Sequence, residues 1–241
     1  EPVVTCYDRG LRTDEGKSTV TATVSSDIFE ASDNVAVASR TCVPSLSGTF
    51  PVGVTEFECT AVDTSGNDRS CTASLEVVDG EKPALVCEDI AIDLPEGASE
   101  GPASFAVSAS DNVDGDVTSS VVCSLASGST LAIGTHAVTC SVSDAAGNVG
   151  DCAWTITMVD TTDPVVTCPA RATLSMAEDE DQAYFEIPAS INVTDNSGET
   201  LPVTCDTQVG AALGEGEHAV VCSATDAFDN TDACELTVVV V

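Results

Sequence analysis

Twelve cysteines are the residues of this 241-residue chain whose number and spacing most clearly indicate chemistry. They form three sets of four: Cys6, Cys42, Cys59 and Cys71; Cys87, Cys123, Cys140 and Cys152; Cys168, Cys205, Cys222 and Cys234. An even number of cysteines beside only two histidines indicates disulfides, which form in oxidising compartments. Structural zinc is the weaker alternative, because no two cysteines have the Cys-x-x-Cys spacing of a zinc site.

Carboxylates are the second group that could bind something. The segment Asp111-Asn112-Val113-Asp114-Gly115-Asp116 gathers three carboxylates and an amide around a glycine. Because Ca²⁺ prefers such oxygen ligands, Asp111, Asn112, Asp114 and Asp116 are a candidate Ca²⁺ site. The competing interpretation is an Asp-rich turn capped by its own side chains. We expect no cofactor that the fold requires, and Ca²⁺ is the ion that this composition favours.

The same composition argues against several functions. With 7 basic and 40 acidic residues the formal net charge is −33, which would repel nucleic acid. The sequence contains no stretch of 18 apolar residues, so we expect no segment of it to insert into a membrane. His136 and His218 lie in different cysteine sets, and neither accompanies a nucleophile motif. We therefore expect a protein that is not an enzyme.

The cysteine sets belong to a repeat. The first cysteines of successive sets are 81 residues apart, which predicts modules at 1–80, 81–161 and 162–241. Other residues recur in phase, namely a proline before each set, the pairs Asp33-Asn34, Asp111-Asn112 and Asp195-Asn196, and the turns Gly66-Asn67, Gly147-Asn148 and Asp229-Asn230. The chain begins at Glu1-Pro2 without a signal-like segment, so we expect a piece of a longer protein.

The elements that position these residues are predicted to be short strands. In the second module Val138, Cys140 and Val142 alternate with polar residues, as in a half-buried strand, and Trp154 and Ile156 follow the same rule after the turn. Turn signals recur about every ten residues. The predicted fold is all-β, with three tandem immunoglobulin-like antiparallel β-sandwiches that each hold two disulfides.

Taken together, the motif Val-x-Cys-x-Ala-x-Asp-x-x-Gly-Asn, the Asp-Asn pair and the segment 47–53 (Ser-Gly-Thr-Phe-Pro-Val-Gly) resemble the hyalin repeat, or HYR domain. The resemblance covers the chain three times and is cleanest in the first module. The second module has 131–134 (Leu-Ala-Ile-Gly) where Phe-Pro-x-Gly is usual, and the third replaces the turn glycine by Asp229. The resemblance implies an immunoglobulin-like extracellular module that occurs in arrays, is associated with adhesion and matrix, and has no catalytic activity.

Four cysteines per module allow three pairings. In an immunoglobulin-like sandwich the first strand lies near the last, which favours Cys6 with Cys71, Cys87 with Cys152 and Cys168 with Cys234. The remaining pairs are then Cys42 with Cys59, Cys123 with Cys140 and Cys205 with Cys222. Pairing of first with third and second with fourth is the alternative. Asn192 begins the only Asn-x-Thr sequon and is a candidate glycosylation site.

We expect a segment of a secreted structural or adhesive protein of the matrix, a cell-surface coat or a filament. Its modules would act as semi-rigid spacers and contact surfaces, Ca²⁺ would modulate their assembly, and the partners would be other copies of the chain or other extracellular proteins. The acidic junctions around Asp79 and Asp160 are a second candidate for Ca²⁺, but we interpret them as plain short linkers. The alternative function is a recognition module of a receptor or adhesin that binds a specific protein or glycan.

Overall fold

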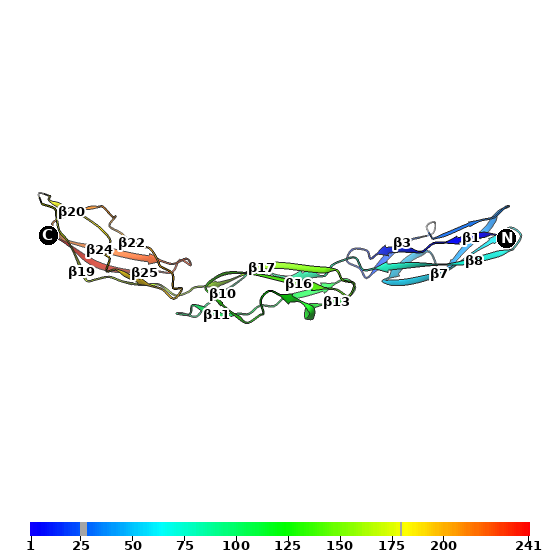
Figure 1. The fold of residues 1–241 in the computed structure, drawn as a ribbon, viewed down its shortest axis with the longest axis horizontal. Coiled ribbons are helices and arrows are strands. Elements are labelled where there is room, and N and C mark those ends of the chain that lie inside the picture. The colour runs from blue at the N-terminus through cyan, green and yellow to red at the C-terminus, as the bar shows by residue number, and fades with distance from the viewer. Residues whose placement is uncertain (25–27, 179) are drawn as a thin grey trace. The chain divides into compact units, whose positions relative to one another are not determined.

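The computed structural model describes residues 1–24, 28–178 and 180–241. These residues form twenty-five strands and one short 3₁₀ turn, η1 (Thr118–Ser120) (Figure 1). The all-β prediction is confirmed. Within the described residues no helix is long and apolar enough to span a membrane.

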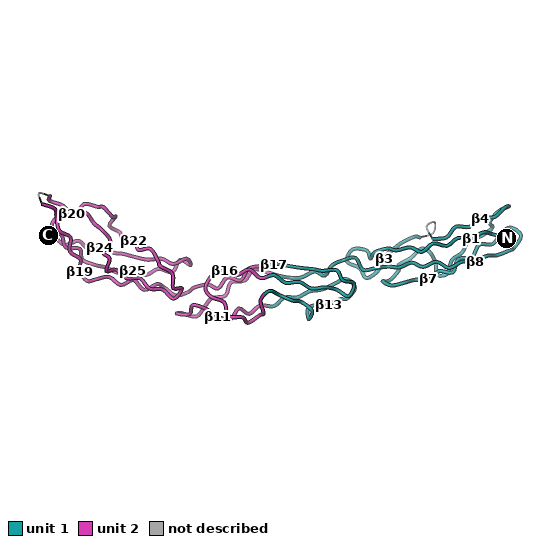
Figure 2. Tube along the Cα trace, in the orientation of Figure 1, with its two compact units in different colours: residues 1–87, 106–124, 139–153 teal, residues 88–105, 125–138, 154–241 magenta. Residues whose placement is uncertain are grey.

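The chain divides into two compact units (Figure 2). Unit one comprises residues 1–87, 106–124 and 139–153, and unit two comprises residues 88–105, 125–138 and 154–241. The first four-cysteine repeat therefore lies wholly in unit one, the third lies in unit two, and the second is divided between them. The expected module junctions near residues 80 and 161 fall inside unit one and unit two, respectively.

The first repeat is a sandwich of one four-stranded sheet and two two-stranded ribbons. The sheet has the order β2-β8-β7-β5, and the ribbons are β1-β4 and β3-β6. Their bounds are β1 (Val3–Cys6), β2 (Arg9–Arg12), β3 (Thr19–Thr23), β4 (Phe29–Ser32), β5 (Val37–Val43), β6 (Ser47–Pro51), β7 (Gly53–Asp63) and β8 (Asp68–Val78).

The second and third repeats have equivalent four-stranded sheets, β10-β17-β16-β14 and β19-β25-β24-β22. The second repeat contains β9 (Ala84–Val86), β10 (Ile90–Asp93), β11 (Glu100–Ala103), β12 (Ser108–Asp111), β13 (Gly115–Asp116), β14 (Val122–Cys123), β15 (Ser129–Ala132), β16 (Gly134–Ser143) and β17 (Val149–Val159). The third contains β18 (Val165–Thr167), β19 (Arg171–Leu174), β20 (Gln182–Tyr184), β21 (Asn192–Thr194), β22 (Val203–Cys205), β23 (Ala212–Gly214), β24 (Gly216–Thr225) and β25 (Thr231–Val240).

Alternating side chains of the two longest strands build the core of each repeat. In β7 the side chains of Phe57, Cys59 and Ala61 are fully buried, whereas Glu56 before Phe57 and Glu58 after it are exposed. Phe50 of β6 packs edge-on against Phe57 with ring centroids 5.8 Å apart. Full burial of such a side chain contributes about 1.5–3 kcal/mol. The period-two pattern seen in the sequence therefore corresponds to one inward face.

Each repeat contains one parallel strand pair in addition to the antiparallel pairs that the sequence predicts. The parallel pairs are β2 with β8, β10 with β17 and β19 with β25. The short strand after the first cysteine runs alongside the last strand of the same repeat. Where it joins, the Asp8 carboxylate accepts a hydrogen bond from the backbone N–H of Ser74, and Asp89 does the same for Thr155. The side chain thereby satisfies a backbone donor at the start of the ladder.

All twelve cysteines form disulfides, two in each repeat. The first cysteine is bonded to the fourth and the second to the third, giving Cys6–Cys71, Cys87–Cys152, Cys168–Cys234, Cys42–Cys59, Cys123–Cys140 and Cys205–Cys222. The second-to-third bridge joins directly opposite residues of neighbouring strands, with Cα atoms 4.1 Å apart for Cys42 and Cys59. On the chain-entropy model, loops of this length contribute about 3–4 kcal/mol of stability per bridge.

The Asp89 carboxylate predicts a dependence of stability on pH. Hydrogen bonds from the backbone N–H and then from the hydroxyl of Thr155 hold the pKa of Asp89 below its ordinary value of 3.8. Because the folded-state pKa is depressed, the contribution is present above pH 3.8 and is lost as the pH falls through the folded pKa. We expect Asp89→Ala to lower the melting temperature at pH 7, and the difference from wild type to shrink below pH 3.8. Thermal unfolding across pH checks this; an Asp151→Ala control, at an exposed carboxylate, should show no such narrowing.

Gly150 in β17 predicts a steric effect at the start of the second repeat. A Cβ atom on Gly150 would lie 2.1 Å from the carbonyl oxygen of Pro83 and 2.9 Å from Leu85. Because a backbone atom cannot yield as a flexible side chain does, we expect Gly150→Ala to destabilise the protein by about 1–3 kcal/mol. Urea unfolding measures the change. Gly48→Ala is the matched control, since a Cβ there meets nothing within 4 Å; equal effects of the two substitutions would contradict the prediction.

Candidate functional site

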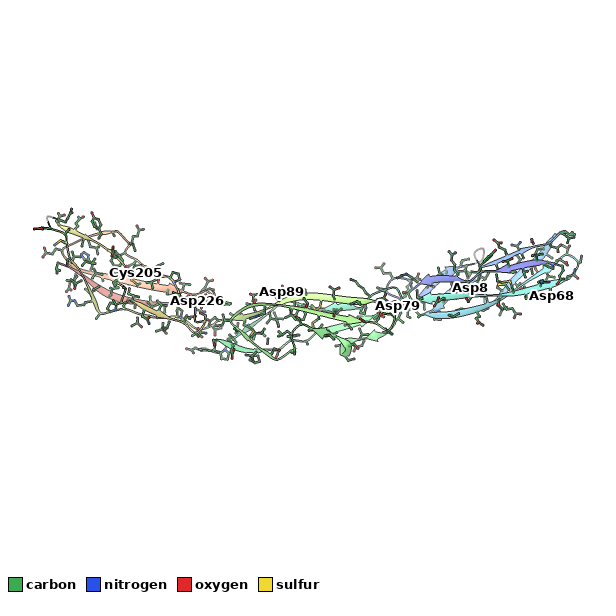
Figure 3. All side chains as sticks on the ribbon, in the orientation of Figure 1. Asp8, Asp68, Asp79, Asp89, Cys205 and Asp226 are labelled. Atoms are coloured by element: carbon green, nitrogen blue, oxygen red, sulfur yellow. A yellow bond between two sulfur atoms is a disulfide. The ribbon has the colours of Figure 1, made fainter. Side chains whose placement is uncertain are left out.

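Three aspartates from separate segments converge at each junction between repeats. Junction cluster one consists of Asp79, Asp111 and Asp144, and junction cluster two of Asp160, Asp195 and Asp226. Within each cluster a carboxylate oxygen of every member lies within 4.8 Å of those of the other two. Cluster one lies in unit one and cluster two in unit two; Figure 3 labels Asp79 and Asp226.

Strand ends position these carboxylates. Asp79 follows the end of β8, Asp111 is the last residue of β12, and Asp144 follows the end of β16. In β16 the inward residues Val138, Cys140 and Val142 are followed, again two residues on, by the buried Asp144. The alternation that fills the core therefore continues onto a carboxylate, so that each cluster closes the end of an apolar interior. Cluster two is built in the same way after β17, β21 and β24.

The turn after the third aspartate is locked by one asparagine. Asn148 donates its backbone N–H and its side-chain NH₂ to the two oxygens of Asp144, both at 2.7 Å. Asn230 holds Asp226 at 2.8 and 2.7 Å. Asp229 has φ 68°, the left-handed conformation that Gly147 has at the corresponding position. The shape of this turn is therefore retained although the glycine is not.

The same asparagines also reach the linker between repeats. The Asn148 side chain donates to the carbonyl oxygen of Asp79 at 3.4 Å, and the Asn230 side chain donates to that of Asp160 at 3.0 Å. The linkers are therefore more than plain spacers, because they supply a carboxylate to each cluster and are bound by the next repeat.

Several buried oxygens of the clusters have no hydrogen-bond partner among the described residues. They are Asp79 Oδ2, Asp111 Oδ2 and Asn112 Oδ1 at cluster one, and Asp160 Oδ2, Asp195 Oδ1 and Asn196 Oδ1 at cluster two. An unsatisfied buried acceptor costs about 1–3 kcal/mol, and a buried uncompensated charge costs more.

The exposed fractions show how far these carboxylates are removed from water. Asp79 is 8% exposed, Asp111 9% and Asp160 only 2%. In each of the three, the other oxygen already accepts backbone hydrogen bonds, such as that from Glu81 to Asp79 at 3.1 Å. One oxygen thus fixes the side chain, and the second has no hydrogen-bond partner among the described residues. Carboxylate oxygens are the ligand type that hard divalent cations prefer.

The first repeat has two of the three carboxylates, Asp33 and Asp63. Asn67 holds Asp63 as Asn148 holds Asp144, and this side-chain hydrogen bond keeps the pKa of Asp63 below its ordinary value.

The structure separates the four residues that the sequence suggested as one Ca²⁺ site. Asp111 belongs to cluster one, and Asn112 directly follows it. Asp114 is exposed and accepts a hydrogen bond from the backbone N–H of Ala145 at 2.6 Å. Asp116 is also exposed and caps Thr118, whose hydrogen bonds hold the pKa of Asp116 below its ordinary value. The loop thus supplies Asp111, while the other carboxylates come from positions about 32 residues away on either side.

From the sequence, Asp79 lies in a candidate junction that is interpreted as a plain linker, and Asp144 is not considered as a ligand. The available signal was their recurrence, since Asp79 and Asp160 are 81 residues apart and Asp144 and Asp226 are 82 apart. Recurrence in phase with the cysteines is shared by many structural residues, so by itself it did not indicate a ligand.

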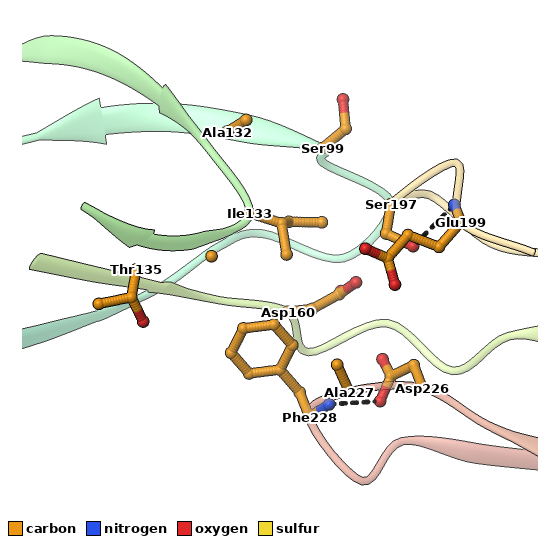
Figure 4. A pocket seen from close by; sticks show the side chains of 11 residues that line it. Ser99, Ala132, Ile133, Thr135, Asp160, Ser197, Glu199, Asp226, Ala227 and Phe228 are labelled. Atoms are coloured by element: carbon orange, nitrogen blue, oxygen red, sulfur yellow. Dashed lines mark hydrogen bonds between the residues drawn. The ribbon is translucent and has the colours of Figure 1, made fainter. Parts of the chain in front are cut away.

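A cavity adjoins each cluster. The one beside cluster two has a volume of about 390 Å³, and its lining includes Ile133, Phe228, Asp160 and Asp226 (Figure 4). The one beside cluster one has a volume of about 500 Å³, and Val113 and Ala145 contribute to its wall. Each cluster thus borders an open, partly apolar space.

The remaining candidates from the sequence have local roles. His136 and His218 hydrogen-bond through Nε2 to the backbone carbonyls of Ala132 and Gly214, both at 2.8 Å. These contacts brace equivalent turns of the second and third repeats. Asn192 is exposed at the start of β21, where the sequon remains a prediction.

Three known proteins illustrate what the chain is similar to. It is 28% identical over 191 residues to the mouse sushi, von Willebrand factor type A, EGF and pentraxin domain-containing protein 1, covering 78% of this chain and 5% of that protein. It is 30% identical over 222 residues to hyalin of Strongylocentrotus purpuratus, covering 88% of this chain and 18% of hyalin. The chain thus spans less than a fifth of these relatives. Repeats 22–24 of mouse cadherin-23 superpose with a TM-score of 0.36 at 15% identity, covering 100% of this chain and 98% of that one.

The family comparison covers most of the chain. The HYR domain matches two consecutive segments, residues 78–158 and 159–240. Each segment begins at the end of the strand that precedes a junction cluster, and the two together cover more than half of the sequence. The chain therefore belongs to the HYR domain family.

Proposed function

We propose that the chain is a segment of an extracellular, adhesion-type multi-domain protein in which disulfide-stapled repeats act as spacers and contact surfaces. We further propose that residues 1–80 are a third HYR repeat. Support comes from the cysteine spacing, which is the same as in the second repeat, and from the pairing Asp63–Asn67, which matches Asp144–Asn148. The proposal includes no catalytic activity.

The observation that carries the function is the pair of junction clusters, each with three convergent carboxylates and unpartnered buried oxygens. We infer that each cluster binds one Ca²⁺. The ligands would be Asp79, Asp111 and Asp144 at the first junction, and Asp160, Asp195 and Asp226 at the second. A divalent cation would offset the repulsion between three carboxylates that lie together away from water.

Ca²⁺ fits this donor set better than the other common divalent ions. The ligands are all oxygens, which disfavours zinc because zinc prefers nitrogen and sulfur. Mg²⁺ demands near-ideal octahedral geometry and keeps several waters, whereas Ca²⁺ accepts six to eight oxygens in irregular arrangements. Extracellular Ca²⁺ modules have dissociation constants on the order of 10⁻⁴–10⁻³ M, and we expect these sites in that range.

Partners would be other copies of the chain or other extracellular proteins. At a net charge of −33, two copies repel each other unless cations intervene. Ca²⁺ bound at the junctions and between acidic faces would lower this repulsion, so contact between chains would depend on the ion.

Binding of Ca²⁺ is tested by calorimetry on the whole chain after removal of divalent ions. We expect about two Ca²⁺ per chain and a raised melting temperature; a ligand at 100 times its dissociation constant contributes about 2.7 kcal/mol. Asp111→Asn keeps the oxygen that caps the turn but lowers the ligand charge, so the stoichiometry should fall from two to one. Asp116→Asn is the matched control in the same loop and should leave it unchanged.

Two results would contradict this assignment. Loss of a site in Asp116→Asn with no effect of Asp111→Asn would place the ion in the turn instead of the junction cluster. Equal heats with Mg²⁺ at the same concentrations would remove the preference for Ca²⁺.

Adhesion is tested with beads that carry the chain. We expect aggregation at Ca²⁺ concentrations on the order of 1 mM, the extracellular range, but not in NaCl of equal ionic strength, which screens charge without occupying the clusters. The double variant Asp111→Asn/Asp195→Asn should aggregate less. Aggregation that is the same with and without Ca²⁺ would show that the contact does not depend on the ion.

A further inference from the structure

One asparagine at each junction contacts a loop of the preceding repeat. The side-chain NH₂ of Asn112 donates to the carbonyl oxygen of Lys17 at 2.7 Å, and that of Asn196 donates to the carbonyl oxygen of Ala98 at 2.9 Å. Lys17 and Ala98 occupy equivalent positions, 81 residues apart, in the loops before β3 and β11. We call residues 13–18 and 94–99 the docking loops.

The linkers hold the same docking loops from another side. The backbone N–H of Gly16 donates to the Glu81 carboxylate at 2.8 Å, and that of Gly97 donates to the Thr162 hydroxyl at 2.8 Å. Glu81 and Thr162 are each two residues after the linker aspartate of a cluster, and each donates its own backbone N–H to that aspartate. Different side chains therefore make the same contact at both junctions. This repetition indicates that the contact is a regular feature of the junction.

In both asparagines the amide oxygen is left without a hydrogen-bond partner in the part of the chain that the structure describes. The Oδ1 atoms of Asn112 and Asn196 are buried and lack a hydrogen-bond partner among the described residues. The Asn196 NH₂ also donates to Asp160 Oδ1 at 3.0 Å, so this amide lies within hydrogen-bond distance of cluster two. Because one planar group carries both atoms, holding the nitrogen on the docking loop also fixes where the oxygen lies.

We propose that Asn112 and Asn196 couple cation binding to docking of the preceding repeat. The inference rests on the proposed binding of Ca²⁺ at the clusters. The amide oxygen is the fourth protein ligand of the ion, and the amide NH₂ holds the docking loop. An ion on the oxygen polarises the amide and strengthens the N–H donor, while a docked loop presents the oxygen to the ion.

This coupling is reciprocal. If the ion tightens the contact with the loop by some factor, the docked loop tightens binding of the ion by the same factor. Such couplings are typically about 5- to 150-fold. Ca²⁺ would then order the boundary between two repeats as well as neutralise it, and each boundary would respond through its own asparagine.

Asn112→Asp separates the two roles of the side chain. The aspartate keeps an oxygen for the ion but has no NH₂ to donate, and it faces the carbonyl oxygen of Lys17. Because the variant replaces a ligand and removes the contact with the loop, we expect calorimetry to show both Ca²⁺ sites occupied but the affinity changed at the first junction only. Hydrogen exchange by mass spectrometry should show wild-type amides of both docking loops exchanging at least about 10-fold more slowly with Ca²⁺. In the variant this protection should be lost in residues 13–18 and kept in residues 94–99.

Asn196→Asp should give the mirror-image result, with protection lost only in residues 94–99. Asn34→Asp is the matched control, because Asn34 is the exposed equivalent in the first repeat, and both loops should remain protected. Protection of residues 13–18 that persists in Asn112→Asp, or is lost at both junctions, would overturn the coupling. So would a wild-type chain that binds Ca²⁺ without slower exchange. A wild-type chain that binds no Ca²⁺ would instead overturn the proposed function, and the coupling with it.

Discussion

Negative charge buried at the repeat boundaries is the constraint on which the junctions depend. Three carboxylates converge at each boundary, yet Arg171 is the only lysine or arginine after Lys82, and it is paired with Glu217. Cluster two therefore has few basic side chains to balance its charge, which is why we propose that a cation supplies the compensating charge. Because its three aspartates belong to a linker, a strand end and a turn, a single ion would order all three segments at once.

The clusters are also a consequence of how the core is built. Each repeat has a thin core of valine, alanine and cystine with a few large side chains, such as Phe185 and Leu236 in the third repeat. Long strands with strict alternation bring this core to the end of the sandwich, where the next inward position is an aspartate. Disulfides hold the same strands in register, so the carboxylates at their ends are carried on a rigid support.

Substitutions between the repeats preserve geometry by different chemical means. Asp8 and Asp89 cap a backbone N–H with a carboxylate, whereas at the equivalent position in the third repeat the carbonyl oxygen of Ala170 accepts from Thr237 at 3.2 Å. Glu81 and Thr162 hold equivalent docking-loop amides with a carboxylate and a hydroxyl. The backbone arrangement is therefore what the repeats have in common, and their surfaces are free to differ.

The sequence by itself determined the all-β fold, the repeat and its family, because cysteine spacing and period-two alternation are local patterns that a strand expresses directly. It also singled out Asp111 and Asn112, since they stand in a visibly acidic turn. Only the tertiary structure decided which carboxylates meet. Asp79 and Asp144 are separated from Asp111 by more than 30 residues, and strand pairing and the crossing between repeats bring them together. Asp116 is only five residues from Asp111, but its carboxylate accepts a hydrogen bond from the backbone N–H of Thr118. Aspartate side chains in turns commonly bond to such nearby backbone donors, and this local bond directs Asp116 away from the cluster.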